Sequence, residues 1–195
     1  MQEIKHYFMP FKAGDRVIEL GGGPGDVTGM PIFRPNVDAR NGPMTDIVHD
    51  LSKTPWPLAS SQFQGVYSSF WLEHVSHKLI RNVIAEIYRI LAPGGLAVLV
   101  TADTWAQCKK IVDAGPEGMT DGLSNMLFGG GDYDGNFHKA ALSRPFATRL
   151  FREAGFFRVE IVDHPGIMGP NGYERVETDM IIEAYKSAAE ISYSL

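Results

Sequence analysis

Short runs of apolar residues alternate along this chain with segments in which apolar residues recur every three or four positions. The apolar runs predict buried strands at 16–20, 35–39, 45–50, 65–70 and 96–103. Two later runs, 157–164 and 178–186, predict two closing strands. Several of these runs lack polar alternation, which is typical of a sheet whose two faces are both covered.

Helical spacing marks the segments between the later strands. The clearest helix follows Ser76, its expected N-cap, and ends at the sequence APGG at 92–95. A second helix is expected over 143–155, between an N-cap at Ser143 and a stop at Gly155. Strand and helix alternation followed by two late strands predicts a doubly wound α/β sheet with a mixed edge.

The segment 115–142 shows no clear period, although a short helix is expected just before it, over 104–114. It is long for a loop inside a compact domain, so it is either functional or partly disordered. We expect 115–142 to form a lid over the acceptor site, because its glycine-rich part at 129–138 has a mobile backbone; the alternative for that part is a flexible surface loop.

The strand predicted at 16–20 runs directly into the turn GGGPG at 21–25. Glycine has no Cβ, so a ligand can approach such a backbone closely. Ligands of open α/β sheets bind beyond the carboxyl ends of the strands, where Glu19, Asp38 and Asp50 are expected. Carboxylates there can accept hydrogen bonds from the hydroxyls of a ribose. The pattern therefore predicts a site for a nucleoside-like ligand.

Composition narrows the class of protein further. The 195 residues, 44% of them hydrophobic, fit a single domain over 1–195 with an N-terminal segment at 1–14. A net charge of −5 disfavours a partner such as nucleic acid. The single cysteine, Cys108, suits a reducing compartment, and we find neither a signal-peptide pattern nor an apolar run of about 20 residues. We expect a cytoplasmic protein without a membrane span, and the sequence leaves its oligomeric state open.

Five ordered motifs resemble those of class I S-adenosylmethionine (SAM)-dependent methyltransferases: VIELGGGPG, NVD, DIVHDLSKTPWP, FQGVYSSFWLEHV and EIYRILAPGGLAVLVTAD. Within this class, GGGDYDGNFH at 129–138 resembles a segment of small, type 11-like methyltransferases of glycan and small-molecule biosynthesis. The resemblance implies a Rossmann-like, seven-stranded, mostly parallel sheet with one antiparallel strand. It also implies SAM as the cofactor and a small molecule or glycan as the methyl acceptor.

The resemblance further implies roles for individual residues. These are Glu19, Gly21, Gly23 and Gly25 for the methionine part of SAM, Asp38 for the ribose hydroxyls, Asp50 and Leu51 for the adenine, and Ser69 and Phe70 for the side that faces cofactor and acceptor.

Residues 26–37 depart from the family pattern, because they carry a glycine and two prolines where the family has its first helix. We expect a loop or a single turn there, so that the first helix is shortened or missing. Two alternatives stay open. One is a catalytically inactive SAM-fold binding or scaffold protein, favoured by this contraction and by FQG at 63–65, where the family usually has an acid. The other is an NAD-type oxidoreductase with a similar glycine turn.

Two histidines are candidates for the chemistry of methyl transfer. His138 and His74 are the expected catalytic residues, each a candidate general base, because an imidazole titrates near neutral pH. His74 next to Glu73 also fits a purely structural tie. Asp132, Asp134 and His138 carry metal-ligating atoms, but their spacing matches no specific ligand set, so we expect no metal.

Overall fold

The computed structural model describes residues 5–6, 9–25, 31–133, 135–162, 167–168 and 177–188. Several expectations fall partly outside this range. They are the N-terminal segment at 1–14, residues 26–30 of the contracted connection, Asp134 of the candidate metal set, and the end of the strand predicted at 157–164.

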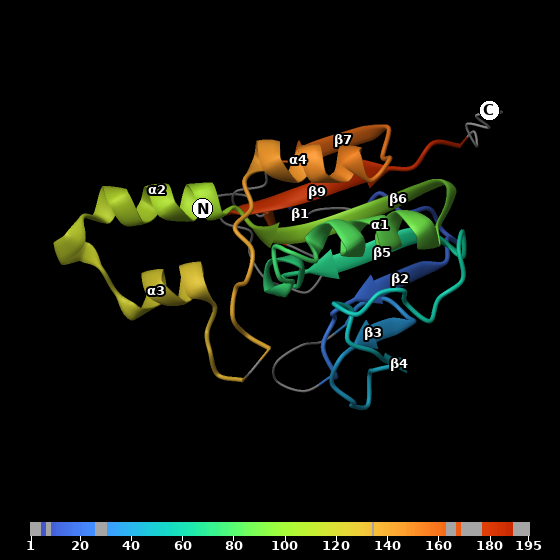
Figure 1. Cartoon of the computed structure of the whole chain (residues 1–195), viewed down its shortest axis with the longest axis horizontal. Helices are drawn as coiled ribbons and strands as arrows, with labels where there is room; N and C mark the ends of the chain where they lie inside the picture. The colour runs from blue at the N-terminus through green and yellow to red at the C-terminus, as the bar shows by residue number, and fades with distance from the viewer. Residues whose placement is uncertain are drawn as a thin grey trace.

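Among the described residues, seven strands form one mixed sheet in the order β4-β3-β2-β5-β6-β9-β7 (Figure 1). Their bounds are β2 Val17–Leu20, β3 Asn36–Asp38, β4 Ile47–Val48, β5 Phe63–Ser69, β6 Leu91–Ala102, β7 Arg158–Val162 and β9 Asp179–Tyr185. Neighbouring strands are parallel except at β9, which runs antiparallel to both β6 and β7. The expected seven-stranded, Rossmann-like sheet with one antiparallel strand is confirmed.

The strand order reverses at β2, which lies between β3 and β5. Glu19 of β2 is in register with Asn36 on one side and with Tyr67 on the other. All four residues of β2 are buried, which explains why three of them are apolar and only Glu19 is polar. A ligand crevice is therefore expected at the carboxyl end of β2.

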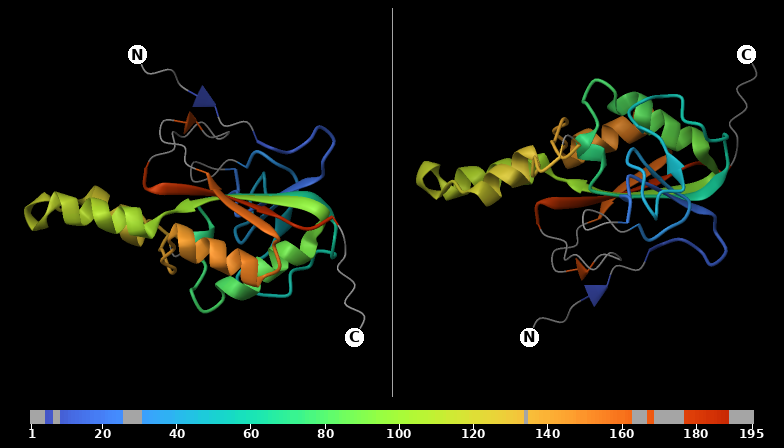
Figure 2. Two further views of the ribbon diagram at one scale, coloured as in Figure 1. Left: turned by 90° about the horizontal axis from the view of Figure 1, so that it is seen from above. Right: turned by 90° about the horizontal axis from the view of Figure 1, so that it is seen from below.

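Two helices, α1 (Ile80–Ile90) and α4 (Arg144–Glu153), pack on one face of the sheet (Figure 2). Their apolar stripes are fully buried, as the helical spacing predicts. The buried apolar side chains are Ile80, Val83, Ile84, Ile87 and Ile90 of α1 and Ala147, Leu150 and Phe151 of α4. They form the main core with the sheet.

The two predicted N-cap serines differ: the Ser76 hydroxyl accepts a hydrogen bond from the amide of Lys78 at 3.4 Å in the turn before α1, and Ser143 makes no such bond in the described part of the chain. α1 begins at Ile80, with Leu79 in the N-cap position, and the carbonyl of Ser76 accepts hydrogen bonds from the amides of these two residues at 3.1 and 2.8 Å. Ser143 occupies the N-cap position of α4, but its side chain makes no capping hydrogen bond among the described residues. Gly155 follows the end of α4 with a φ of +107°, as expected of a helix stop.

Aromatic side chains from segments without helical structure cover the opposite face of the sheet. Phe11 packs edge to face on Phe33 at a centroid distance of 5.5 Å, and Phe33 packs on Tyr67 at 5.4 Å. A Cβ on Gly65 would lie 2.7 Å from the Phe11 ring, so glycine in β5 makes room for this cover. Residues 31–35 form no helix, in agreement with the contraction expected after the glycine turn.

A small parallel sheet, formed by β1 (Lys5–His6) and β8 (Ile167–Met168), is separate from the main sheet. Figure 2 shows it on the side of the main sheet opposite α1 and α4. The sequence pattern predicts neither strand, because two residues are too few to show an alternation.

The segment 115–142 contains more structure than expected. The predicted short helix is confirmed as α2 (Thr104–Ala114), but a 3₁₀ turn, η2 (Pro116–Gly118), and a helix, α3 (Asp121–Phe128), follow where we expected a loop. No residue of α3 is fully buried, and its apolar residues Leu123, Met126 and Leu127, at helical spacing, are half-buried. α2 and α3 project beyond the carboxyl end of β6 (Figure 1). None of the described helices is long and apolar enough to cross a membrane.

Candidate functional site

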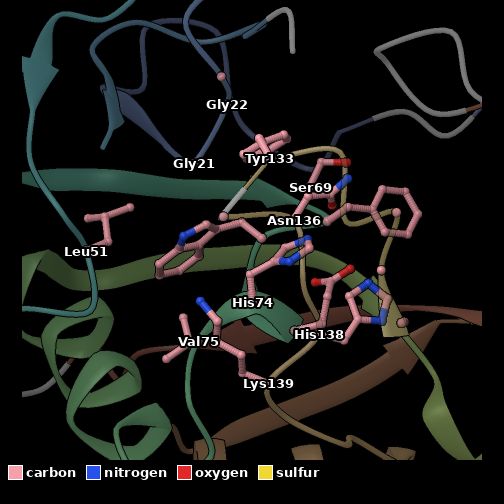
Figure 3. Close-up of a pocket in the computed structure, with 18 of the residues that line it drawn as sticks. Gly21, Gly22, Leu51, Ser69, His74, Val75, Tyr133, Asn136, His138 and Lys139 are labelled. Atoms are coloured by element: carbon pink, nitrogen blue, oxygen red, sulfur yellow. The ribbon is translucent and has the colours of Figure 1, made fainter. Parts of the chain in front are cut away.

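A cavity of about 1460 Å³ lies at the carboxyl ends of the parallel strands (Figure 3). Its glycine-loop side includes residues 19, 21–23, 38–40 and 50–52, and its histidine side residues 73–75, 107, 110, 125–126, 129–130, 132–133, 135–136 and 138–139. The wall includes these residues expected from the sequence: Glu19, Gly21, Gly23, Asp38, Asp50, Leu51, Ser69, Phe70, His74 and His138. Gly25 is not on the wall. The fold thus brings together ten of the eleven expected positions.

The glycine loop is held by side chains and backbone of the neighbouring strand β3. The amide of Gly21 donates to the carbonyl of Val37 at 2.8 Å. The amide of Gly22 donates to Oδ1 of Asn36 at 3.1 Å, and the amide of Gly23 donates to Oδ2 of Asp38 at 3.0 Å. These three amides are engaged within the protein, so the loop offers them to no phosphate.

Positions 21 and 25 both require glycine, each because of a different neighbouring side chain. Gly21 has a φ of +69°, and a Cβ there would lie 2.3 Å from Cγ of Trp71, which lines the cavity. Gly25 has a φ of +84°, and its Cβ would lie 2.5 Å from Cγ of Met44. Gly21 therefore shapes the cavity wall, whereas Gly25 permits packing of the loop against the chain after β3.

Glu19 is buried at the end of β2 and fixes the contracted connection. Its Oε2 accepts hydrogen bonds from the amides of Ile32 and Phe33 at 2.7 and 2.8 Å. Burial raises the pKa of this carboxyl group from 4.5 to about 7, against the lowering effect of the two amides. A buried carboxyl group thus holds in place the segment that replaces a helix.

Asp38 joins the glycine loop to the segment that follows β3. Besides Gly23, it accepts a hydrogen bond through Oδ1 from the amide of Arg40 at 2.8 Å. The Arg40 guanidinium lies 4.6 Å from the centroid of the Tyr133 ring, a cation–π contact across the two sides of the cavity. A carboxylate has about four acceptor positions, so Asp38 retains capacity for ligand hydroxyls.

Asp50 and Leu51 lie on the wall beyond β4. Oδ1 of Asp50 accepts hydrogen bonds from the amide and hydroxyl of Ser52 at 3.0 and 2.6 Å, and the Ser52 hydroxyl is the main cause that lowers the Asp50 pKa. Leu51 is buried, and its carbonyl accepts a hydrogen bond from Nε1 of Trp56 at 2.9 Å. The wall here combines an apolar surface with a carboxylate.

Ser69 and Phe70 stand where β5 ends. The Ser69 hydroxyl is buried and makes no hydrogen bond within the described part of the chain. Phe70 has a φ of +51°, which is rare for a bulky residue and is found where a site requires it. An unpaired buried hydroxyl on a cavity wall is suited to a polar ligand group.

Glu73 anchors the histidine side. It lies in the 3₁₀ turn η1 (Leu72–His74), is buried, and accepts a hydrogen bond from the Thr101 hydroxyl at 2.9 Å. Burial raises its pKa to about 7. Its carbonyl accepts hydrogen bonds from the amides of Lys139 and Ala140 at 2.8 and 3.2 Å, which fixes the segment 139–140 beside η1.

The two candidate bases lie next to each other although they are far apart in the sequence. The rings of His74 and His138 are 5.0 Å apart between centroids, and Figure 3 shows both facing the same part of the cavity. Nδ1 of His74 is 3.1 Å from the carbonyl oxygen of Phe137, and Nδ1 of His138 is 3.1 Å from that of Leu127. Burial is the main cause that lowers the pKa of each ring, so both are neutral at pH 7.

Gln107 is a wall residue that sequence reasoning missed. It is the one buried residue of α2, and its Oε1 has no hydrogen-bond partner among the described residues. No motif marks it, because only the packing of α2 turns this side chain toward the cavity. Trp71 also lines the cavity.

Comparison with known proteins identifies the family. The sequence profile of a methyltransferase domain family matches residues 1–161. The chain belongs to this family. The expected class I SAM-dependent methyltransferase, an enzyme with SAM as its cofactor, is confirmed. No curated protein matches this methyltransferase significantly in sequence.

Solved structures agree at the level of the fold. A SAM-dependent methyltransferase from Mesorhizobium loti is 19% identical, with a TM-score of 0.58 over 91% of this chain and 94% of that one. One from Archaeoglobus fulgidus is 15% identical, with a TM-score of 0.57 over 90% and 88%. The 1,6-didemethyltoxoflavin-N1-methyltransferase of Burkholderia thailandensis, solved with its substrate and S-adenosylhomocysteine, is 15% identical, with a TM-score of 0.52 over 89% and 71%.

The geometry of the glycine loop also argues against the NAD-type alternative. Dinucleotide sites bind a pyrophosphate with amides of the glycine turn and the N-terminus of the helix that follows. In this methyltransferase the amides of Gly21, Gly22 and Gly23 donate to β3, and the described residues 31–35 are not helical. SAM carries no phosphate and needs neither feature.

Proposed function

We propose that this methyltransferase transfers the methyl group of SAM to a small polar molecule bound on the histidine side of the cavity. The observation that carries the proposal is one cavity with two chemically different sides. The glycine-loop side presents glycines and the carboxylate of Asp38. The histidine side presents Glu73, His74, His138 and Oε1 of Gln107, which has no hydrogen-bond partner among the described residues. A single cavity of this size has room for two reactants held close together, as methyl transfer requires.

The residues at the strand ends fit the methyl donor. Gly21 and Gly23 allow its methionine part to approach the backbone, Asp38 would accept the ribose hydroxyls, and Asp50 with Leu51 would frame the adenine. The unpaired hydroxyl of Ser69 would meet a polar group near the reacting centre. Gly25 would act indirectly, by shaping the loop.

The reaction needs few protein groups. An oxygen or nitrogen of the acceptor forms a bond to the methyl carbon, the electron pair of the carbon–sulfur bond stays on sulfur, and the acceptor loses a proton. His138 or His74 would take that proton in a metal-free enzyme, because both rings are neutral at pH 7. This role for the histidines stays a prediction.

A polar acceptor is favoured by the groups on the histidine side. Gln107, Asn125, Asn136, Lys110 and Lys139 all line it, and such groups bind hydroxyl, carbonyl or amino groups. A free small molecule and the end of a glycan would present the same chemistry. The Burkholderia methyltransferase of similar fold binds 1,6-didemethyltoxoflavin, which supports a small-molecule acceptor here.

Calorimetric titration with S-adenosylhomocysteine tests the proposal on the wild type, Asp38→Ala and the control Asp113→Ala, whose residue is exposed on α2. We expect micromolar binding by the wild type and the control, and at least tenfold weaker binding by Asp38→Ala, about 1.4 kcal/mol.

A folded wild type that gives no heat and no thermal shift at millimolar ligand would support the scaffold alternative instead. Equal affinities of the three proteins would remove Asp38 from the site. After binding is established, a screen of hydroxylated and amino-bearing small molecules against short glycans would separate the two acceptor classes by initial rate.

A further inference from the structure

We propose that Glu73, His74 and His138 bind one divalent first-row transition-metal ion on the histidine side of the cavity. The binding itself depends only on these side chains, whereas its role in catalysis rests on the proposed function.

The three side chains converge closely enough to share an ion. One candidate ligand atom from each lies within 4.8 Å of those of the other two. Ligand atoms of an ion with bonds of about 2.0–2.1 Å lie roughly 3–4 Å apart, so small side-chain rotations close the site. The ligands come from two segments, 73–74 and 138, that the backbone bonds of Glu73 to Lys139 and Ala140 hold together.

The ring of His138 presents Nε2 to an ion. A carbonyl oxygen only accepts hydrogen bonds, so the contact of Nδ1 with the carbonyl of Leu127 places the proton of the neutral His138 ring on Nδ1 and its lone pair on Nε2. The ring of His74 has two carbonyl partners, Phe137 through Nδ1 and Phe70. Metal-ligating histidines are commonly oriented in this way, with the second nitrogen donating to a backbone carbonyl.

Glu73 supplies the anionic ligand. Oε2 of its carboxylate accepts the hydrogen bond from Thr101, and the amides of Glu73 itself and of Ala102 also donate to this group. A carboxylate has about four acceptor positions, so it keeps capacity for an ion. The side chain is buried at the cavity wall, where a carboxylate is normally paired with a cation. An ion bound by Glu73 and both histidines would provide this pairing.

The donor set selects the kind of ion. Two imidazole nitrogens and one carboxylate suit zinc, cobalt, iron or manganese, whereas calcium and magnesium prefer oxygen ligands throughout. Three protein ligands on the wall of an open cavity leave positions for an outside molecule, which is the pattern of catalytic rather than structural sites.

An ion at this position would bind the acceptor by its reacting oxygen or nitrogen. Coordination to a divalent ion lowers the pKa of a hydroxyl group, so the proton would pass to water without a histidine acting as base. In that case His74 and His138 are ligands, and the metal-free general base described above is excluded.

The test uses the full chain, produced without a histidine tag and freed of metal by a chelator. It is titrated with Co²⁺ and Zn²⁺ by calorimetry, and Co²⁺ ligation is followed by visible absorption. The variants are His138→Gln and Glu73→Gln, and the matched control is His77→Gln, an exposed histidine outside the cluster. S-adenosylhomocysteine titration and circular dichroism on each protein verify the fold independently of the metal.

We expect one Co²⁺ per chain in the wild type and in His77→Gln, and at least tenfold weaker binding in His138→Gln and Glu73→Gln with S-adenosylhomocysteine affinity retained. Two results would overturn the proposal: a wild type that binds S-adenosylhomocysteine but no stoichiometric metal, or equal metal affinities in all four proteins. A wild type that binds metal but not S-adenosylhomocysteine would contradict the proposed function and leave the metal site standing.

Discussion

The two sides of the cavity are built in opposite ways. On the glycine-loop side, the backbone amides and the carboxylates of Glu19 and Asp38 satisfy one another before any ligand binds. On the histidine side, the groups come from η1, α2 and the segment after α3, and the carbonyl of Gln107 has no partner in the part of the chain that the structure describes. A preformed side suits a ligand that a whole family shares, and a side with open polar groups suits the substrate that distinguishes one member.

The glycine-loop side should tolerate substitutions less well than the histidine side. Gly21→Ala places a Cβ 2.3 Å from Trp71 at a φ of +69°. We expect it to weaken S-adenosylhomocysteine binding at least about 100-fold, or roughly 2.7 kcal/mol, in calorimetric titration. Gly115→Ala is the matched control, because Gly115 has a φ of +70° with nothing within 4 Å. Equal affinities of the two variants would show that Trp71 yields and that this side is not rigid.

The buried carboxyl group of Glu19 should make this side sensitive to pH. Its pKa is about 7 in the folded protein and near 4.5 in the unfolded chain, so the proton binds more tightly to the folded state. This contribution to stability is therefore complete below about pH 4.5 and is lost as the pH rises through 7.

The substitution Glu19→Gln should remove this loss of stability at high pH. Between pH 5 and pH 8, we expect the difference in unfolding free energy to shift in favour of the variant by about 2–3 kcal/mol, measured by denaturant titration without SAM. Glu160→Gln, at an exposed position of β7, should show no such shift. Parallel pH profiles for the wild type and Glu19→Gln would mean that Glu19 keeps its ordinary acidity.

A buried polar group without a partner on the histidine side should lower the free energy of unfolding. Gln107→Met replaces a buried, unpaired carbonyl with an apolar group of similar length, and we expect the free energy of unfolding to rise by up to about 1 kcal/mol. Gln62→Met should lower it by about as much, because Oε1 of Gln62 accepts a hydrogen bond from the amide of Ala59 at 3.0 Å. S-adenosylhomocysteine affinity should stay unchanged in both. Destabilisation by Gln107→Met would show that its side chain is already satisfied, and the contrast between the two sides would weaken.

The glycine-loop side could be predicted because local signals mark it. The apolar run of β2, the glycines after it and the acids at the ends of β2 and β3 are all readable along the chain. Even here, the partners of these acids were not predictable. Asp38 and Glu19 bond to the amides of Gly23 and of 32–33, which depends on strand register and on the path of a helix-free connection.

The histidine side was predictable only as a set of polar residues. His74 and His138 were identifiable as candidates, but their pairing, 64 positions apart, required the chain to turn back after α3. The helix α3 was not predicted, because its apolar residues Leu123, Met126 and Leu127 extend over little more than one turn and a glycine stands at its second position.

The hydrophobic pattern of the sequence thus determined the strands of the sheet and the helices α1 and α4, because burial of apolar side chains imposes a period that can be read along the chain. The glycines themselves marked the turn after β2. The tertiary structure alone determined that Glu73, His74, His138 and Gln107 line the same side of one cavity. Contacts of exposed or half-buried polar side chains impose no period on a sequence, and distant segments meet only after the sheet has formed.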